Sequence, residues 1–98
     1  MANKKDQLDM TRKEELFVIL QEECGEVVQA VSKILRFGED SYHPNDKTKT
    51  ANIDHLVSEL GDIFGVLKLL LEENHIDGET LMEAAELKIK KLEKYMKN

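Results

Sequence analysis

The sequence predicts an all-α protein, a bundle of three long helices preceded by a short N-terminal segment and completed by oligomerisation. Helix-forming residues dominate, with one proline and five glycines in 98 residues. Apolar residues recur at spacings of three and four over three stretches, whereas apolar runs typical of strands are scarce. A chain of this length holds one core, so residues 1–98 are expected to form a single domain.

The first helix is expected from Thr11, which forms a capping-box pattern with Glu14, to the stop at Phe37 and Gly38. A polar loop should follow from Gly38 to Asn52, a candidate lid that contains the turn sequence His43-Pro44-Asn45-Asp46. The inward stripe of the first helix comprises Leu16, Leu20, Glu23, Val27, Ala30 and Ile34.

The second helix is expected to be capped by Asn52 and to end near Asn74. Its inward stripe comprises Asn52, Leu56, Glu59, Ile63, Val66 and Leu70. A short turn should lead to a third helix, which Asp77 is expected to cap. The positive charge of this helix is concentrated near its end. One face of that helix comprises Leu81, Ala85, Lys88, Leu92 and Met96.

Charge and cysteine content narrow the class of protein. The net charge of −6 argues against general nucleic-acid binding, because a polyanion would be repelled. Cys24 is the only cysteine, which rules out an internal disulfide, and its place in an apolar pattern predicts a small buried residue. Residues Met1 to Asp9 contain no apolar stretch that would serve as a signal or membrane span. A cytoplasmic protein with no membrane contact is expected.

Two carboxylates occupy positions where the helical pattern calls for apolar residues. Glu23 and Glu59 each lie near the middle of an inward stripe, and no lysine or arginine shares those stripes. Glu26 and Asp62 follow three residues later, on the same helix faces. Because buried carboxylates require compensation, these four acids predict a cation site.

The donor type indicates which cation. All-oxygen ligation suits magnesium or manganese, whereas zinc and di-iron sites usually recruit histidine or cysteine, and the chain contains no Glu-x-x-His. Glu22 would sit at the edge of the site, where it could hold a water molecule. The alternative is that these acids are solvated, since such spacing is common on exposed helix faces. Their inward position favours the metal site.

Three segments carry a resemblance to a known family: Glu22-Glu23-Cys24-Gly25-Glu26-Val27, Ser32-Lys33-Ile34-Leu35-Arg36-Phe37-Gly38 and Glu59-Leu60-Gly61-Asp62-Ile63. The chain resembles the MazG-like all-α nucleotide pyrophosphohydrolases, whose signature is EExxE followed by ExxD, over about Leu16 to Lys94. The resemblance implies a homodimer or dimer of dimers that hydrolyses (d)NTP to (d)NMP and pyrophosphate with magnesium, a house-cleaning enzyme of the nucleotide pool.

The resemblance also implies residue roles. Glu23, Glu26, Glu59 and Asp62 would ligate Mg²⁺, or Mn²⁺ in its place, and Glu22 would orient or deprotonate the attacking water. A triphosphate needs its negative charge neutralised during hydrolysis, which calls for basic residues as well as metal. The residues expected to contact the substrate are Lys33, Arg36, Lys88, Lys91 and Tyr95.

The chain departs from the family pattern in two places. The 32 residues between Glu26 and Glu59 exceed the usual spacing, which indicates an enlarged loop that influences substrate choice. Val66 replaces an aromatic residue that stacks on the base in several relatives. Phe37, Tyr42 and Phe64 are the alternatives for that contact, each equally expected to serve plain packing. His55, one turn before Glu59, is a candidate hydrogen-bond partner of it.

Two other functions fit the same helices. One is a non-catalytic helical dimer that acts as a regulatory or partner-binding module. The other is a phosphoribosyl-ATP pyrophosphohydrolase, which shares the bundle and the use of metal; the sequence around the second motif resembles the MazG-like form more closely.

Overall fold

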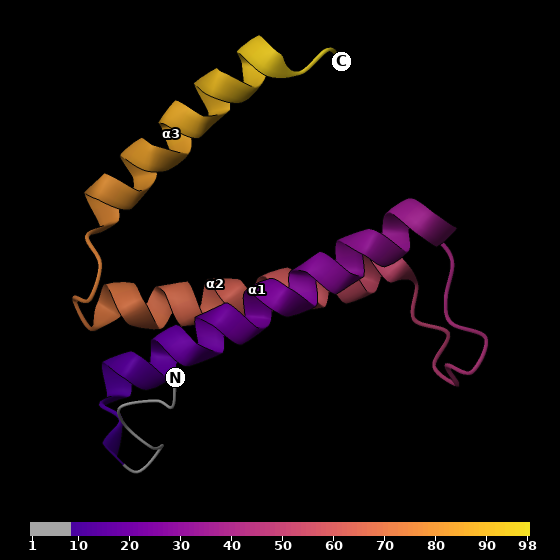
Figure 1. Ribbon diagram of the computed structural model, residues 1–98, viewed down its shortest axis with the longest axis horizontal. Coiled ribbons are helices and arrows are strands. Elements are labelled where there is room, and N and C mark those ends of the chain that lie inside the picture. Colours follow the sequence, from indigo (N-terminus) through magenta and orange to yellow (C-terminus); the bar gives the residue numbers. More distant parts are fainter. Residues whose placement is uncertain (1–8) are drawn as a thin grey trace, which may run out of the picture.

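The computed structural model describes residues 9–98, which form three helices and no strand. The helices are α1 (Arg12–Phe37), α2 (Asn52–Glu72) and α3 (Gly78–Tyr95) (Figure 1). The predicted all-α class is therefore confirmed. The N-terminal segment expected before the first helix lies, up to residue 8, outside the described residues.

Two of the three predicted helix caps are present. The Thr11 hydroxyl accepts a hydrogen bond from the Glu14 amide at 3.1 Å, and the Glu14 carboxylate accepts one from the Thr11 amide at 3.0 Å. Asp77 accepts from the Thr80 amide at 2.9 Å, a bond that holds the pKa of Asp77 below its usual value. Both side chains thus satisfy amides that a helix start leaves without partners.

The expectation that Asn52 caps α2 is wrong. Ala51 occupies the cap position, and Asn52 is the first residue of the helix. The Asn52 side chain is buried, and its amide nitrogen donates to the Gly38 carbonyl at 3.0 Å. Asn52 therefore ties the two ends of the α1–α2 loop together instead of satisfying the helix start.

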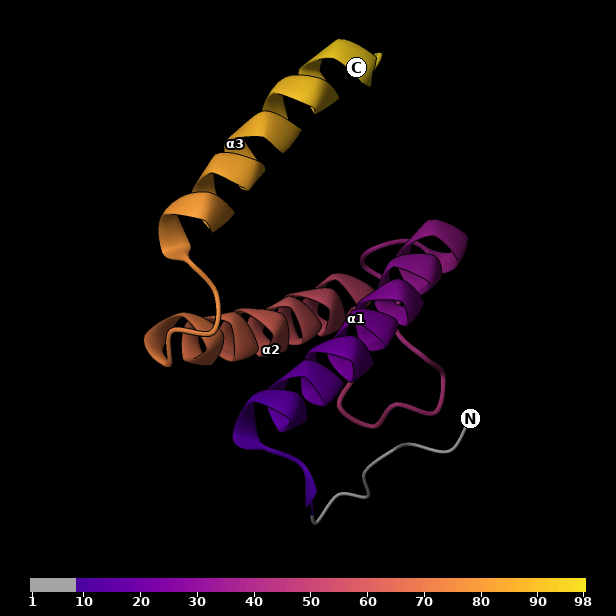
Figure 2. The same ribbon diagram turned by 60° about the vertical axis from the view of Figure 1, so that its left-hand side comes forward.

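α1 and α2 lie side by side and antiparallel, as both views show (Figures 1 and 2). Arg12 at the start of α1 pairs with Glu73 just after α2, with Nη2 2.8 Å from Oε2. Every residue of the two predicted inward stripes is buried or half-buried, which confirms the periodicity. The core lies toward the Arg12 end of the pair and comprises Leu16, Val66 and Leu70, with Leu20, Leu67 and Ile76 packed against them.

Cys24 is exposed, so the prediction of a buried residue is wrong. Cys24 follows Glu23 directly, and one residue turns a helix by about 100°, which carries its side chain off the inward stripe.

α3 stands away from the helix pair, connected to it by a short turn at the end of α2 (Figures 1 and 2). Leu81 is half-buried, but the other residues of its predicted face are exposed. Within the described chain this face therefore has no packing partner. None of the helices in residues 9–98 has both the length and the apolar character required to cross a membrane.

The α1–α2 loop is held by its own hydrogen bonds. Gly38 ends α1 with φ 97° and ψ 153°, a conformation that only glycine adopts readily. Asp46 accepts from the amide of Thr48 at 2.9 Å, from its hydroxyl at 2.6 Å and from the Thr50 amide at 3.1 Å. These bonds, first among them that of the Thr48 hydroxyl, lower the pKa of Asp46 to about 2.

Candidate functional site

Carboxylates from both helices of the pair converge near its middle. Glu23 on α1 and Glu59 and Asp62 on α2 each place a carboxylate oxygen within 4.8 Å of the other two. Glu23 and Glu59 are half-buried, and Asp62 is exposed at the edge. The antiparallel pairing brings the two motifs level with each other, although Glu59 lies 36 positions after Glu23 in the sequence.

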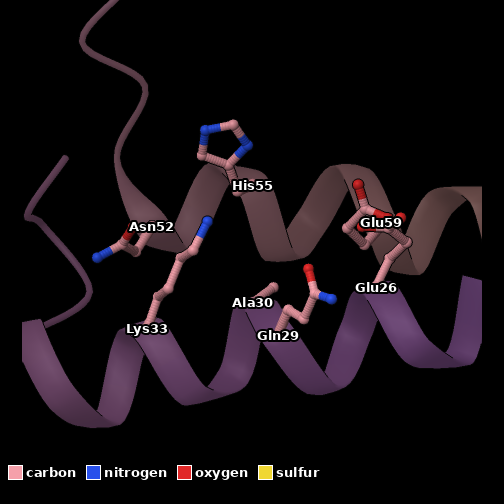
Figure 3. Close-up of a pocket in the computed structure, with 7 residues that line it drawn as sticks. All are labelled: Glu26, Gln29, Ala30, Lys33, Asn52, His55 and Glu59. Atoms are coloured by element: carbon pink, nitrogen blue, oxygen red, sulfur yellow. The ribbon is translucent and has the colours of Figure 1, made fainter. Parts of the chain in front are cut away.

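Glu26 lies beside this cluster, at one end of a small cavity between the helices. Figure 3 shows Glu26 on α1 and Glu59 on α2 reaching towards each other across the gap. The cavity has a volume of about 80 Å³ and continues past Gln29 and His55 to Lys33. All four predicted acids therefore lie in one region of the helix pair.

One oxygen of the Glu23 carboxylate, Oε2, is buried without a hydrogen-bond partner among residues 9–98. Burial raises the pKa of Glu23 above its ordinary value, and the nearby charges of Asp62, Glu59 and Glu26 raise it further. An unpartnered buried oxygen beside other carboxylates is unfavourable unless a cation is bound.

The donor set fits a hard divalent cation. It consists of carboxylate oxygens from two helices, the ligand type that magnesium and manganese prefer. The orphaned Glu23 oxygen is the observation that makes this cluster differ from an ordinary solvated group of acids. These residues are thus able to hold a divalent metal.

Only some of the other predicted site residues lie near the acids. Lys33 lines the same cavity as Glu26 and Glu59, and Glu22 is exposed on the adjacent strip of α1. Arg36 lies over the Phe37 ring, with the guanidinium carbon 4.7 Å from the ring centroid. The remaining candidates, Lys88, Lys91 and Tyr95, are exposed on α3, which the structure does not bring to the acids (Figure 1).

His55 lies at the cavity, but its ion-pair partner is in the loop. Its Nε2 atom is 3.8 Å from Oδ2 of Asp46, and the structure gives no hydrogen bond between His55 and Glu59 in the described chain. His55 therefore links the start of α2 to the loop.

The role of Asn52, which lines the cavity and also holds the loop, was missed by the sequence analysis. The available signal was a polar residue on an inward stripe, the same signal that identified Glu23 and Glu59. We instead predicted that Asn52 caps the helix, because an asparagine at a helix start is usually a cap.

Comparison with family models gives one assignment. The family described as MazG nucleotide pyrophosphohydrolase domain matches residues 11–98, which include all three helices. Searches of curated proteins and of solved structures gave no match.

Proposed function

The chain belongs to the MazG nucleotide pyrophosphohydrolase domain family, and we propose that it hydrolyses (d)NTP to (d)NMP and pyrophosphate in a magnesium-dependent reaction. The observation that carries this proposal is the convergence of Glu23, Glu59 and Asp62 around a buried oxygen without a partner. We take residues 1–98 as one catalytic domain that clears unwanted nucleotides from the pool.

Glu23, Glu26, Glu59 and Asp62 would hold the metal, with Mg²⁺ as the first candidate and Mn²⁺ as the second. A bound divalent ion would supply positive charge to the phosphate oxygens, whose repulsion otherwise hinders attack. Glu22 is one turn before Glu26 on α1, and we place its carboxylate at the edge of this cluster. There its carboxylate would orient the water that attacks the α-phosphorus and accept a proton from it.

The single chain offers limited positive charge near the acids. Lys33 lines the cavity and is suited to a phosphate contact. Lys88, Lys91 and Tyr95 lie on α3, which stands away from the helix pair (Figure 2). We propose a homodimer or dimer of dimers, in which α3 packs on another copy and carries these residues to that copy's substrate.

The direct test is pyrophosphate release from a panel of ribo- and deoxyribonucleoside triphosphates, with and without Mg²⁺. Wild-type protein should release pyrophosphate only with the metal. Glu23→Gln and Asp62→Asn should each lower the rate by about a hundredfold or more, because each removes a charged metal ligand. Glu72→Gln, an exposed change on α2, is the control and should keep wild-type turnover. Full turnover in both site variants would refute the metal assignment.

The same assay separates the alternative functions. A non-catalytic dimer would release no pyrophosphate from any nucleotide and would not be stabilised by Mg²⁺. A phosphoribosyl-ATP pyrophosphohydrolase would act on that nucleotide in preference to the ordinary triphosphates. The unpaired Glu23 oxygen favours a metal-dependent function over the non-catalytic one.

A further inference from the structure

A second groove opens between the end of α1 and the α1–α2 loop. Its volume is about 420 Å³, and its lining includes the rings of Phe37, Tyr42, His43 and Pro44. None of the clustered carboxylates, Glu23, Glu26, Glu59 and Asp62, lines it. Phe37 and Tyr42 are 58% and 45% exposed, so large parts of both rings are open to a ligand. The flat aromatic rings of Phe37 and Tyr42 suit a planar aromatic ligand.

This groove continues from the cavity beside the acids. Lys33 and Asn52 line both spaces, and Figure 3 shows them at the end of the cavity away from Glu26. Glu26, Lys33 and Phe37 follow one another along α1, and the helical rise places Phe37 about 16 Å beyond Glu26. A ligand held at the acids by its phosphate can therefore extend past Lys33 into the groove.

We propose that this groove receives the base of the nucleotide substrate, with Phe37 and Tyr42 as its aromatic contacts; this inference rests on the proposed hydrolysis of nucleoside triphosphates. Two parts of such a substrate extend from the α-phosphorus, the pyrophosphate and the nucleoside. The groove has four rings and a single lysine in its lining, a composition that suits the nucleoside and not a multiply charged pyrophosphate.

The groove is formed before any ligand binds. The Ser41 hydroxyl donates to the Phe37 carbonyl at 2.6 Å, and the Asn52 amide donates to the Ser41 carbonyl at 2.8 Å. The Asn52 side chain donates to Gly38, which fixes the other end of the same turn. Because these bonds already order the loop that carries Tyr42, binding loses little conformational entropy.

His43 supplies a polar contact in the groove. Its Nδ1 atom accepts a hydrogen bond from the Asn45 amide at 3.0 Å, so a neutral His43 carries its proton on Nε2. A neutral His43 therefore has an N–H group that is able to donate to a ring nitrogen or carbonyl oxygen of a base. Stacking itself accommodates every base, since each has an aromatic face.

Steady-state kinetics of the full chain with Mg²⁺ test this inference, with inorganic tripolyphosphate as a competitive inhibitor that has no base. Tyr42→Ala and Phe37→Ala should each raise KM for nucleoside triphosphates about tenfold and leave the tripolyphosphate inhibition constant unchanged. An unchanged KM in both variants would overturn the inference, as would an inhibition constant that rises equally. Phe64→Ala examines the other candidate, and a KM increase confined to that variant would place the base on α2 instead.

A second measurement does not depend on catalysis. The chain has two tyrosines, Tyr42 and Tyr95, so their ring signals can be assigned by NMR with a Tyr95→Phe variant. A nucleoside monophosphate should shift the Tyr42 ring signals, whereas ribose 5-phosphate should not. A wild-type protein that releases no pyrophosphate would refute the proposed hydrolysis, and the Tyr42 shift would still decide whether the groove binds a base. Equal responses to both probes, or none to either, would refute the base site.

Discussion

Glu23 occupies a position that the helix pair would otherwise fill with an apolar side chain. Its neighbours on the inward stripe, Leu20 and Val27, are half-buried against α2, and the Glu23 carboxylate is held in the same layer. Burial and the charges of Asp62 and Glu59 both oppose its ionisation. The protein without metal therefore contains an unfavourable charge cluster, and a bound cation would convert that cluster into a favourable interaction.

Replacement of Glu23 should separate stability from function. In EDTA, Glu23→Gln should melt at a higher temperature than wild type, because the amide removes one of the mutually repelling charges. Mg²⁺ should raise the melting temperature of wild type and leave that of Glu23→Gln nearly unchanged, since a ligand that binds the folded state stabilises it. Circular dichroism melting curves with EDTA and with Mg²⁺ provide the measurement, and Glu72→Gln should respond to Mg²⁺ like wild type.

Gly38 is the residue whose backbone conformation the loop requires. At φ 97° and ψ 153° a side chain is strained, although only the Ser41 hydroxyl lies within 4 Å of the added carbon. Gly38→Ala should therefore lower the free energy of unfolding by about 1–3 kcal/mol. Gly65→Ala on α2, where the added carbon meets nothing within 4 Å, should raise it by about 0.5–1 kcal/mol. Urea titrations measure both values; equal effects would contradict the conformational argument.

At the scale of helices and loops, sequence patterns predicted the features that depend on residues close together in the sequence. The capping box at Thr11 and the cap at Asp77 both involve a partner three residues away, and both are present. The inward stripes identified Glu23 and Glu59 because burial follows helical periodicity. Asn52 was misassigned because its partner, the carbonyl of Gly38, is 14 residues away and is identified only by the folded loop.

The internal order of the loop makes it sensitive to acid. Its hydrogen bonds lower the pKa of Asp46 from 3.8 to about 2, so ionised Asp46 stabilises the folded state at pH values above 3.8. This contribution is lost as the pH falls through about 2. Asp46→Asn keeps the shape of the side chain but lacks the charge and one acceptor oxygen. The melting temperature of wild type should exceed that of Asp46→Asn at neutral pH.

The difference between the two proteins should shrink as the pH approaches 2, because protonated wild-type Asp46 also loses its charge. Melting curves at a series of pH values measure this convergence. A difference that stays constant with pH would show that Asp46 acts through its shape alone.

At the scale of the whole molecule, the sequence predicted α3 as a helix but did not specify its position. α1 and α2 pack against each other along their apolar stripes, whereas α3 leaves the pair after Asp77 (Figure 2). Leu92 and Met96 remain exposed on its apolar face. The structure of one chain therefore leaves this face without the burial that stabilises amphipathic helices, which is the reason to expect a second copy.

A charge placed on the apolar face of α3 should prevent assembly. Wild type should sediment as a dimer or tetramer of the 11.3 kDa chain, and Leu92→Asp should sediment as a smaller species, because an aspartate is unfavourable in a buried apolar interface. Lys90→Asp introduces the same side chain on the other side of α3 and should keep the wild-type assembly. If α3 also carries Lys88, Lys91 and Tyr95 to a partner's substrate, Leu92→Asp should lose pyrophosphate release together with assembly. A wild-type protein that remains monomeric at all concentrations would contradict this account and would require one chain to supply all the phosphate contacts itself.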